Sequence, residues 1–215
     1  SENEILKAMA EYSMFSTDRS LINTARSEAD NYIDYLKAIK DINKIQFAGS
    51  LRRAKETIGD IDILTTVKDP EKSREIIIKH FVNYPEVLNV IAEGDTKSSV
   101  LLKSGINVDL RVVADESFGA ALHYFTGSKE HNVKMRDLAK RKGMKLNEYG
   151  MFKGEKMIAG DNEQELFKLV GMPFVPPEMR KNDGEFEYGL EHGEMPKLVE
   201  LGDIKGDLHC HSTYS

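Results

Sequence analysis

An apolar strand that carries two acidic residues constrains the fold of this chain more than any other feature. Residues 60–67 read Asp-Ile-Asp-Ile-Leu-Thr-Thr-Val, a run rich in β-branched side chains. In a strand, residues i and i+2 face the same side, so Asp60 and Asp62 share one face and Ile61 and Ile63 share the other. Neighbouring carboxylates on a buried strand repel each other unless a cation neutralises them. The run therefore predicts a metal site, and Mg²⁺ suits it because Mg²⁺ prefers oxygen ligands and keeps positions open for water and phosphate.

A candidate phosphate-binding segment precedes this strand. Gly49 and Ser50 stand between a predicted strand and a helix predicted over 51–57. Glycine lets the backbone approach a ligand, and a helix N-terminus offers free N–H groups to an anion. Arg52 and Arg53 follow at once and can neutralise phosphate oxygens. Together with the two carboxylates, this segment predicts a site for a triphosphate and a metal.

Two-metal phosphoryl transfer needs a further carboxylate, and Asp109 is the candidate. It lies in the second strand of a hairpin predicted over 98–103 and 106–113, which are separated by a two-residue Ser-Gly turn. Arg111 shares the face of Asp109 and is expected to orient a carboxylate before a metal binds. The plainer alternative is a solvated Asp–Arg pair on a surface strand, which would contribute little.

The remaining pattern predicts helices around these strands and a second, smaller unit. Helical periodicity or capping residues occur over 16–36, 69–81, 128–141 and 162–170, with Ser16 and Thr17 as N-cap candidates. A short strand is expected over 45–48, and a second hairpin over 145–159. From Pro173 onward the Pro-, Gly- and Glu-rich sequence predicts mostly linker. A hairpin beside other strands indicates the α+β class, with a boundary near 115–117.

Three motifs in register resemble the family X DNA polymerases, in particular the bacterial and archaeal type that carries a C-terminal PHP (polymerase and histidinol phosphatase) domain. The first resembles the catalytic signature: Gly-Ser-Leu-Arg-Arg at 49–53 followed by Gly-Asp-x-Asp at 59–62. The second, Val-Asp-Leu-Arg at 108–111, resembles the strand that carries the third aspartate. The third, Tyr-Phe-Thr-Gly-Ser at 124–128, resembles the start of the thumb, and Asn132, Arg136 and Asn147-Glu148-Tyr149 continue the match.

The resemblance implies an α+β fold with two parts. A nucleotidyltransferase palm, a mixed β-sheet with helices, would occupy 1–116, and a small α+β thumb subdomain would occupy 117–185. Residues 186–215 would be linker and the truncated start of the PHP domain. The implied activity is DNA-directed DNA synthesis, the addition of dNMP to a primer 3′-end in short-gap repair. The implied partners are a dNTP, primer–template or gapped DNA, and two Mg²⁺ ions, with Mn²⁺ as an alternative metal.

The resemblance also assigns roles residue by residue. The catalytic, metal-binding carboxylates would be Asp60, Asp62 and Asp109. The residues that bind the incoming nucleotide would be Gly49, Ser50, Arg53, Gly59, Tyr124, Phe125, Gly127 and Asn132. Contacts to DNA and the network that changes as the thumb closes would involve Arg136, Arg111 and Glu148.

Two other functions stay open on the sequence. A non-templated nucleotidyltransferase would share the Gly-Ser and Asp-x-Asp motifs, and a non-catalytic DNA-binding scaffold for a PHP nuclease would share the domain order. The run at 206–212 resembles the first PHP metal motif and contains His209 and His211, but the other ligands of that domain are absent. We therefore expect no PHP nuclease or phosphatase activity from this chain.

The net charge of the whole chain and the charge of its separate segments favour different binding partners. The chain has 215 residues, 40% hydrophobic and 31% charged, and a net charge of −6, which alone argues against nucleic acid. Residues 129–145, however, carry seven Lys or Arg against two acids, whereas 178–207 carry nine acids against four bases. We expect the basic segment to face DNA. One cysteine, no membrane-length apolar run and no signal sequence predict a cytoplasmic monomer.

Overall fold

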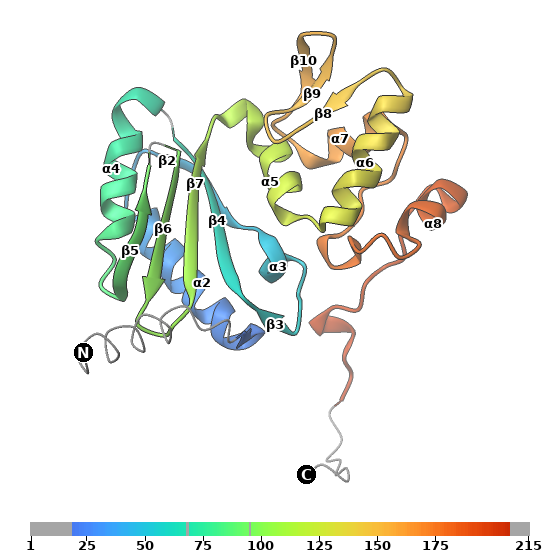
Figure 1. Ribbon diagram of the computed structural model, residues 1–215. Helices are drawn as coiled ribbons and strands as arrows, with labels where there is room; N and C mark the ends of the chain where they lie inside the picture. The colour runs from blue at the N-terminus through green and yellow to red at the C-terminus, as the bar shows by residue number, and fades with distance from the viewer. Residues whose placement is uncertain (1–18, 68, 95, 207–215) are drawn as a thin grey trace, which may run out of the picture.

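A five-stranded mixed sheet organises the first part of the chain in the computed structural model, which describes residues 19–67, 69–94 and 96–206 (Figure 1). Its strands, in spatial order, are β2 (Ile42–Phe47), β4 (Asp60–Val67), β7 (Asn107–Val113), β6 (Lys97–Leu102) and β5 (Val87–Glu93). Strands β4 and β7 pair in parallel, and every other neighbouring pair is antiparallel. The predicted hairpin is confirmed as β6 and β7, and the mixed sheet with its helices agrees with the expected α+β fold.

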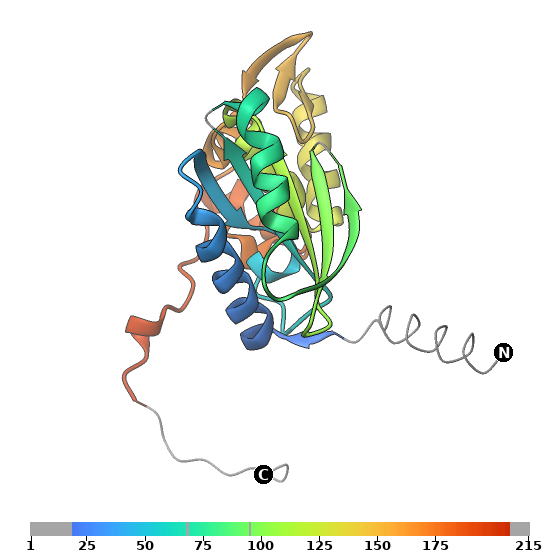
Figure 2. The same ribbon diagram turned by 90° about the vertical axis from the view of Figure 1, so that its left-hand side faces the viewer.

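Two helices cover one face of this sheet, α2 (Ile22–Lys37) and α4 (Pro70–Val82) (Figure 2). Ile61 and Ile63 project into the core between them, as the alternation of β4 predicts. Tyr32 of α2 stacks on Phe81 of α4 with ring centroids 4.9 Å apart, which joins the helices. Helix α2 has Leu21 at its N-cap position. The expected caps Ser16 and Thr17 lie outside the described residues.

The segment between β2 and β4 differs from expectation. Helix α3 (Gly49–Arg52) begins earlier and is shorter than the helix predicted over 51–57, because Gly49 at φ +60° lets the chain turn directly out of β2. Strand β3 (Thr57–Ile58) follows and pairs with β1 (Ser20–Leu21). Strand β5 was not predicted either, since it lies at a sheet edge with nearly every side chain exposed and gives no alternating pattern.

The second part of the chain packs helices against a three-stranded sheet. It contains the helices α5 (Phe118–Thr126), α6 (Lys129–Arg141) and α7 (Glu163–Val170), and the strands β8 (Lys145–Leu146), β9 (Met151–Lys153) and β10 (Lys156–Ala159). Short 3₁₀ turns are η1 (Asp115–Ser117), η2 (Pro177–Met179) and η3 (Leu201–Asp203). Ser128 and Asn162 cap α6 and α7 by accepting backbone N–H bonds, and both helices begin where the sequence predicts them.

Helix α8 (Glu185–His192) corrects the expectation of linker after Pro173. Phe186 is fully buried and belongs to the same core as Phe167 of α7. Glu185 is also buried and forms a 2.8 Å contact with the His131 ring. The expected end of the thumb at residue 185 therefore falls inside this helix. The helix is only eight residues long and contains a glycine, so its sequence carries little helical periodicity.

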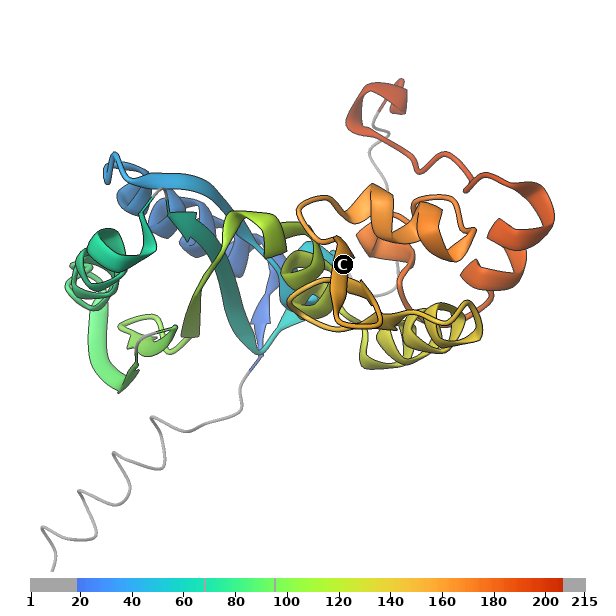
Figure 3. The same cartoon turned by 90° about the horizontal axis from the view of Figure 1, so that it is seen from above.

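Helix α5 lies between the sheet and the rest of the second part (Figure 3). Phe118 and Ala121 of α5 pack on Leu64, which shares a face of β4 with Asp60 and Asp62. The carboxylates therefore face the side of the sheet on which the second part sits. Among the described residues, no helix combines the length and apolar character that a bilayer crossing requires.

Candidate active site

A cavity of about 520 Å³ opens where the two parts of the chain meet. Its lining combines carboxylates from the sheet with basic and aromatic side chains from both parts. The lining residues are Arg19, Gly49, Ser50, Arg53, Lys55, Asp60, Asp62, Tyr124, Phe125, Gly127, Lys129, Asn132 and Arg136. Ten of the residues singled out from the sequence are therefore brought together in one place.

Asp60 and Asp62 form the acidic end of this cavity, at the start of β4. Burial, the Asp60 carboxylate and the Asp109 carboxylate together raise the pKa of Asp62 to about 6. Asp62 and Asp109 are register partners across the parallel pair β4–β7. A divalent cation would relieve this repulsion and suits carboxylate oxygens, so the donor set fits Mg²⁺ or Mn²⁺.

Asp109 does not line the cavity, because two side chains of β6 hold its carboxylate. Ser99 Oγ donates to Asp109 Oδ1 at 2.6 Å, and Lys97 Nζ lies 2.7 Å from Asp109 Oδ2. Accordingly, no three His, Cys, Asp or Glu side chains within the described part of the chain are already arranged around a metal position. The Lys97 ammonium, which the sequence analysis did not single out, neutralises the Asp109 carboxylate.

In the described part of the chain Arg111 forms no ion pair with Asp109, but its positive charge acts against the rise in the pKa of Asp62. The expectation that Arg111 orients a carboxylate stays a prediction. The Arg111 guanidinium carbon lies 4.2 Å from the centre of the Phe125 ring, a cation–π contact. Arg111, Phe125 and Glu148 line a neighbouring cavity of about 280 Å³. The residues expected to respond to thumb movement thus sit beside the main cavity and share Phe125 with it.

The basic side of the main cavity centres on Arg53. Arg53 Nη1 donates to the backbone oxygen of Thr126, and its Nε is buried with no hydrogen-bond partner. Burial lowers the pKa of this guanidinium. A Cβ at Gly49 would collide with the Asp62 carboxylate, so glycine is required where α3 meets β4. Gly59, by contrast, is exposed and lies outside the cavity.

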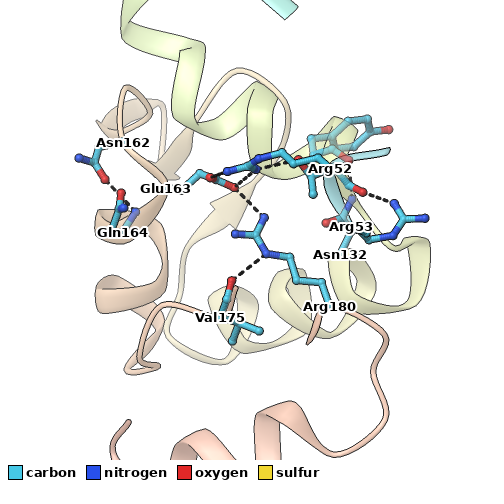
Figure 4. Close-up of polar contacts among 10 residues, drawn as sticks. Arg52, Arg53, Asn132, Asn162, Glu163, Gln164, Val175 and Arg180 are labelled. Carbon is cyan, nitrogen blue, oxygen red and sulfur yellow. Dashed lines mark hydrogen bonds and ion pairs between the residues drawn. The ribbon is translucent and has the colours of Figure 1, made fainter. Parts of the chain in front are cut away.

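Arg52 points away from the cavity, although it is adjacent to Arg53 (Figure 4). Arg52 Nη2 lies 2.6 Å from Glu163 Oε2, and Arg52 Nη1 donates to Thr126 Oγ1 at 2.8 Å. Arg180 Nη1 also lies 2.6 Å from Glu163 Oε1, and both Glu163 and Arg180 are buried. The expected role of Arg52 in neutralising phosphate is therefore wrong. Arg52 joins α3 to α7 instead.

The side of the cavity opposite the sheet is formed by the end of α5 and the start of α6. Tyr124 and Phe125 pack edge to face, with ring centroids 5.1 Å apart. Asn132 Nδ2 donates to the Tyr124 backbone oxygen at 2.7 Å, while its Oδ1 is buried without a partner. Gly127 is left-handed and precedes a cis peptide bond to Ser128. Arg136 is exposed at the rim.

Two basic lining residues were missed by the sequence analysis, Arg19 and Lys55, whereas Lys129 belongs to the basic segment that was expected to face DNA. Lys55 could have been found from its position two residues after Arg53. Arg19 carries no such local signal. Its Nε donates to Thr57 Oγ1 at 2.8 Å, and this contact through β3 brings it to the cavity.

Comparison with known proteins agrees with this architecture. The DNA polymerase beta palm model matches residues 25–104, and the DNA polymerase beta thumb model matches residues 121–181. The chain is 40% identical to the DNA polymerase/3′–5′ exonuclease PolX of Bacillus subtilis, over 100% of this chain and 37% of that protein. It is 30% identical to the repair DNA polymerase X of African swine fever virus, over 75% of this chain and 95% of that protein.

Eukaryotic proteins are similar to this chain as well. DNA polymerase lambda of Rattus norvegicus is 30% identical over 61% of this chain and 28% of that protein. A ternary complex of Leishmania infantum polymerase beta has the same fold, with a TM-score of 0.68 and 23% identity over 79% of this chain and 78% of that chain. The chain belongs to the family X DNA polymerases. It spans about a third of the length of the cellular curated relatives, 37% of the Bacillus protein and 28% of the rat protein.

Proposed function

We propose that this chain is the catalytic part of a DNA-directed DNA polymerase that fills short gaps during repair. One observation carries the proposal: a single cavity has paired carboxylates at one end, Arg53 beside them, and the Tyr124–Phe125–Gly127 segment across from them. A metal-bound triphosphate and a sugar need those three kinds of surface side by side. Membership of the polymerase family supports the same function.

The reaction would join the primer 3′-oxygen to the α-phosphorus of a dNTP, break the bond between that phosphorus and the bridging oxygen, and release pyrophosphate. Asp60, Asp62 and Asp109 would hold two Mg²⁺ ions, or Mn²⁺. Those ions, when bound, supply activation of the 3′-hydroxyl and neutralisation of the phosphates. For Asp109 to take part, its carboxylate must leave Lys97, which lies 2.7 Å away.

The other residues of the chain position the reactants. Arg53 would donate to β- and γ-phosphate oxygens through its Nε side, which has no partner among the described residues, aided by Ser50 and the Gly49 backbone. The expected contact from the Gly59 backbone, which lies outside the cavity in this structure, stays a prediction. Tyr124, Phe125 and Gly127 would pack on the sugar.

Two residues of α6 would contact the base pair. Asn132 would donate from its Nδ2, which donates to the Tyr124 backbone oxygen in this structure, to the acceptor at the minor-groove edge of the incoming base, and Arg136 would contact the template. Arg111 and Glu148, which line the neighbouring cavity, would exchange partners as the thumb closes. We further propose the division into a palm over 1–116 and a thumb from 117, extended through α8. The cytoplasmic location and the monomeric state stay predictions.

The test is extension of a primer across a one-nucleotide gap with Mg²⁺ or Mn²⁺, with and without a template base. We expect template-dependent extension that Asp62→Ala abolishes while the fold is retained. Extension without a template would favour a non-templated nucleotidyltransferase. Absence of metal-dependent dNTP binding would favour a non-catalytic scaffold. Parental activity in Asp62→Ala would refute the site assignment.

A further inference from the structure

A second cavity of about 440 Å³ adjoins the proposed active site and shares Arg19, Arg53 and Lys55 with it. We call it the basic groove. Its other lining residues are Ala54, Glu56, Thr57, Glu178 and Lys181. Because three cationic side chains line both spaces, the groove continues from the Arg53 side of the active site. Asn132 and Arg136, which lie where the base would be, do not line it.

The basic groove is cationic and poorly neutralised. Across the described ranges, neither Lys55 nor Lys181 takes part in an ion pair, although Glu56 and Glu178 also line the groove. The buried Nε of Arg53 has no hydrogen-bond partner. Unpaired cations around a cavity favour an anion, because such a ligand would supply the charge that neighbouring side chains do not.

The two lysines come from different parts of the chain. Lys55 follows α3 in the palm, whereas Lys181 follows η2 at the end of the thumb segment matched by the family model. An anion in the groove would therefore be contacted by one lysine from the palm and one from the thumb. Lysine is a flexible, strongly hydrated point charge, which suits a ligand that is held briefly rather than in a fixed orientation.

We propose that the basic groove binds the inorganic pyrophosphate that leaves the active site, with Lys55 and Lys181 as its ligands beyond Arg53. This inference rests on the proposed polymerase function. A small polyanion fits better than a DNA backbone for two reasons. The groove shares Arg53 with the end of the cavity proposed for phosphate, and its four cationic side chains line one partly open cavity of about 440 Å³ instead of following a line.

A binding experiment tests the groove without any turnover. Magnesium pyrophosphate is titrated calorimetrically into the full chain and into Lys181→Ala, with Lys168→Ala, an exposed lysine on α7, as the matched control. We expect the dissociation constant to rise about ten-fold in Lys181→Ala, the loss of one charge-assisted contact, and to stay unchanged in Lys168→Ala. Equal affinity in all three proteins would overturn the proposal.

Steady-state kinetics on gapped DNA distinguish a groove that binds the product pyrophosphate from one that binds the substrates dNTP or DNA. For Lys181→Ala we expect the inhibition constant for pyrophosphate to rise about ten-fold, together with the pyrophosphate concentration that half-saturates the reverse reaction. A rise confined to the KM for dNTP would instead make the groove part of the triphosphate site. A rise confined to the DNA dissociation constant would make it a DNA contact. Either result overturns the assignment to pyrophosphate.

The two proposals can fail independently. Pyrophosphate binding that depends on Lys181, in a chain that extends no primer, would support the groove and refute the polymerase function. Template-dependent extension in which Lys181→Ala leaves every pyrophosphate constant unchanged would refute the groove and support the polymerase.

Discussion

The Glu163 carboxylate lies 2.6 Å from the guanidinium of Arg52, a residue 111 positions earlier in the chain. The contact joins α3 beside the carboxylate strand to α7 of the thumb. Arg180 approaches the same carboxylate at 2.6 Å, so one buried acidic group neutralises the buried Arg180 and the half-buried Arg52. Removing an acid from such a set leaves charges without a partner in a low-dielectric interior.

Glu163→Gln should therefore lower the free energy of unfolding by about 3–5 kcal/mol, because Arg52 and Arg180 lose their shared counter-charge. Chemical denaturation measures the loss. Glu165→Gln, two residues away and exposed, is the control and should change stability by less than about 0.5 kcal/mol. A small effect of Glu163→Gln would mean that the packing of α3 against α7 does not depend on this ion pair.

His123 should make the thumb sensitive to acid. The side chain is fully buried, neither ring nitrogen has a hydrogen-bond partner among the described residues, and burial lowers its pKa well below 6.5. The unfolded chain therefore binds more protons as the pH falls below about 6.5, so stability falls as the pH is lowered through that point. The slope for one group approaches about 1.4 kcal/mol per pH unit.

His123→Phe tests this dependence by removing the titrating ring. We expect the variant to lose less stability than the parent between about pH 7 and pH 5, measured by denaturant unfolding at each pH. His192→Phe, on the exposed side of α8, is the control and should keep the parental slope. Identical slopes in the parent and His123→Phe would contradict the prediction.

Gly49→Ala should remove metal-dependent dNTP binding. The added Cβ would collide with the Asp62 carboxylate at a position where φ is +60°. Gly154→Ala provides a matched control, because its φ is +62° and nothing lies within 4 Å of the added Cβ. Both variants should lose about 1 kcal/mol of stability from the left-handed backbone, but only Gly49→Ala should lose nucleotide binding in a fluorescence titration.

Lys97→Met should strengthen metal binding. The Lys97 ammonium lies 2.7 Å from Asp109 and competes with a cation for that carboxylate. Without it, the Mn²⁺ concentration that half-saturates the protein should fall by about three-fold, as expected for a partly exposed ion pair. Electron paramagnetic resonance of free Mn²⁺ measures this. Lys103→Met, on the same hairpin, should leave the value unchanged. Weaker Mn²⁺ binding in Lys97→Met would show that the lysine supports the metal site.

Phe186→Ala should destabilise the thumb by about 3–5 kcal/mol, because the ring is fully buried in the core that contains Phe167. Tyr188→Ala, on the same helix but 38% exposed, should cost far less. Denaturation curves of both variants check the difference. Equal, small losses would restore the view that this segment is only a linker.

Local pattern predicted the strand of Asp60 and Asp62, the β6–β7 hairpin and the helices that begin after Ser128 and Asn162. These features depend on neighbours in sequence, where side-chain periodicity and turn chemistry are decisive. The distinction between Arg52 and Arg53 could not be predicted. Two adjacent arginines have the same intrinsic preferences, and only Glu163 turns one of them toward the joint.

Asp109 shows the same limit in the candidate site. Alternation placed it on the polar face of its strand, and the parallel register with Asp62 confirms that the two positions are adjacent. The sequence did not indicate Lys97 and Ser99, the two residues of the neighbouring strand that hold its carboxylate. Which side chains face each other on neighbouring strands depends on the register of the two strands. The local sequence pattern of one strand does not determine that register.

The parallel pairing of β4 with β7 also determines when, during synthesis of the chain, the three carboxylates can come together. On the ribosome, β4 emerges first and must wait for β5 and β6 before its parallel neighbour is made. A nascent chain released before β7 would carry Asp60 and Asp62 but lack Asp109. If the proposed function holds, prematurely terminated products would be unable to consume nucleotides, and activity would arise only once the translated length is enough to complete the sheet.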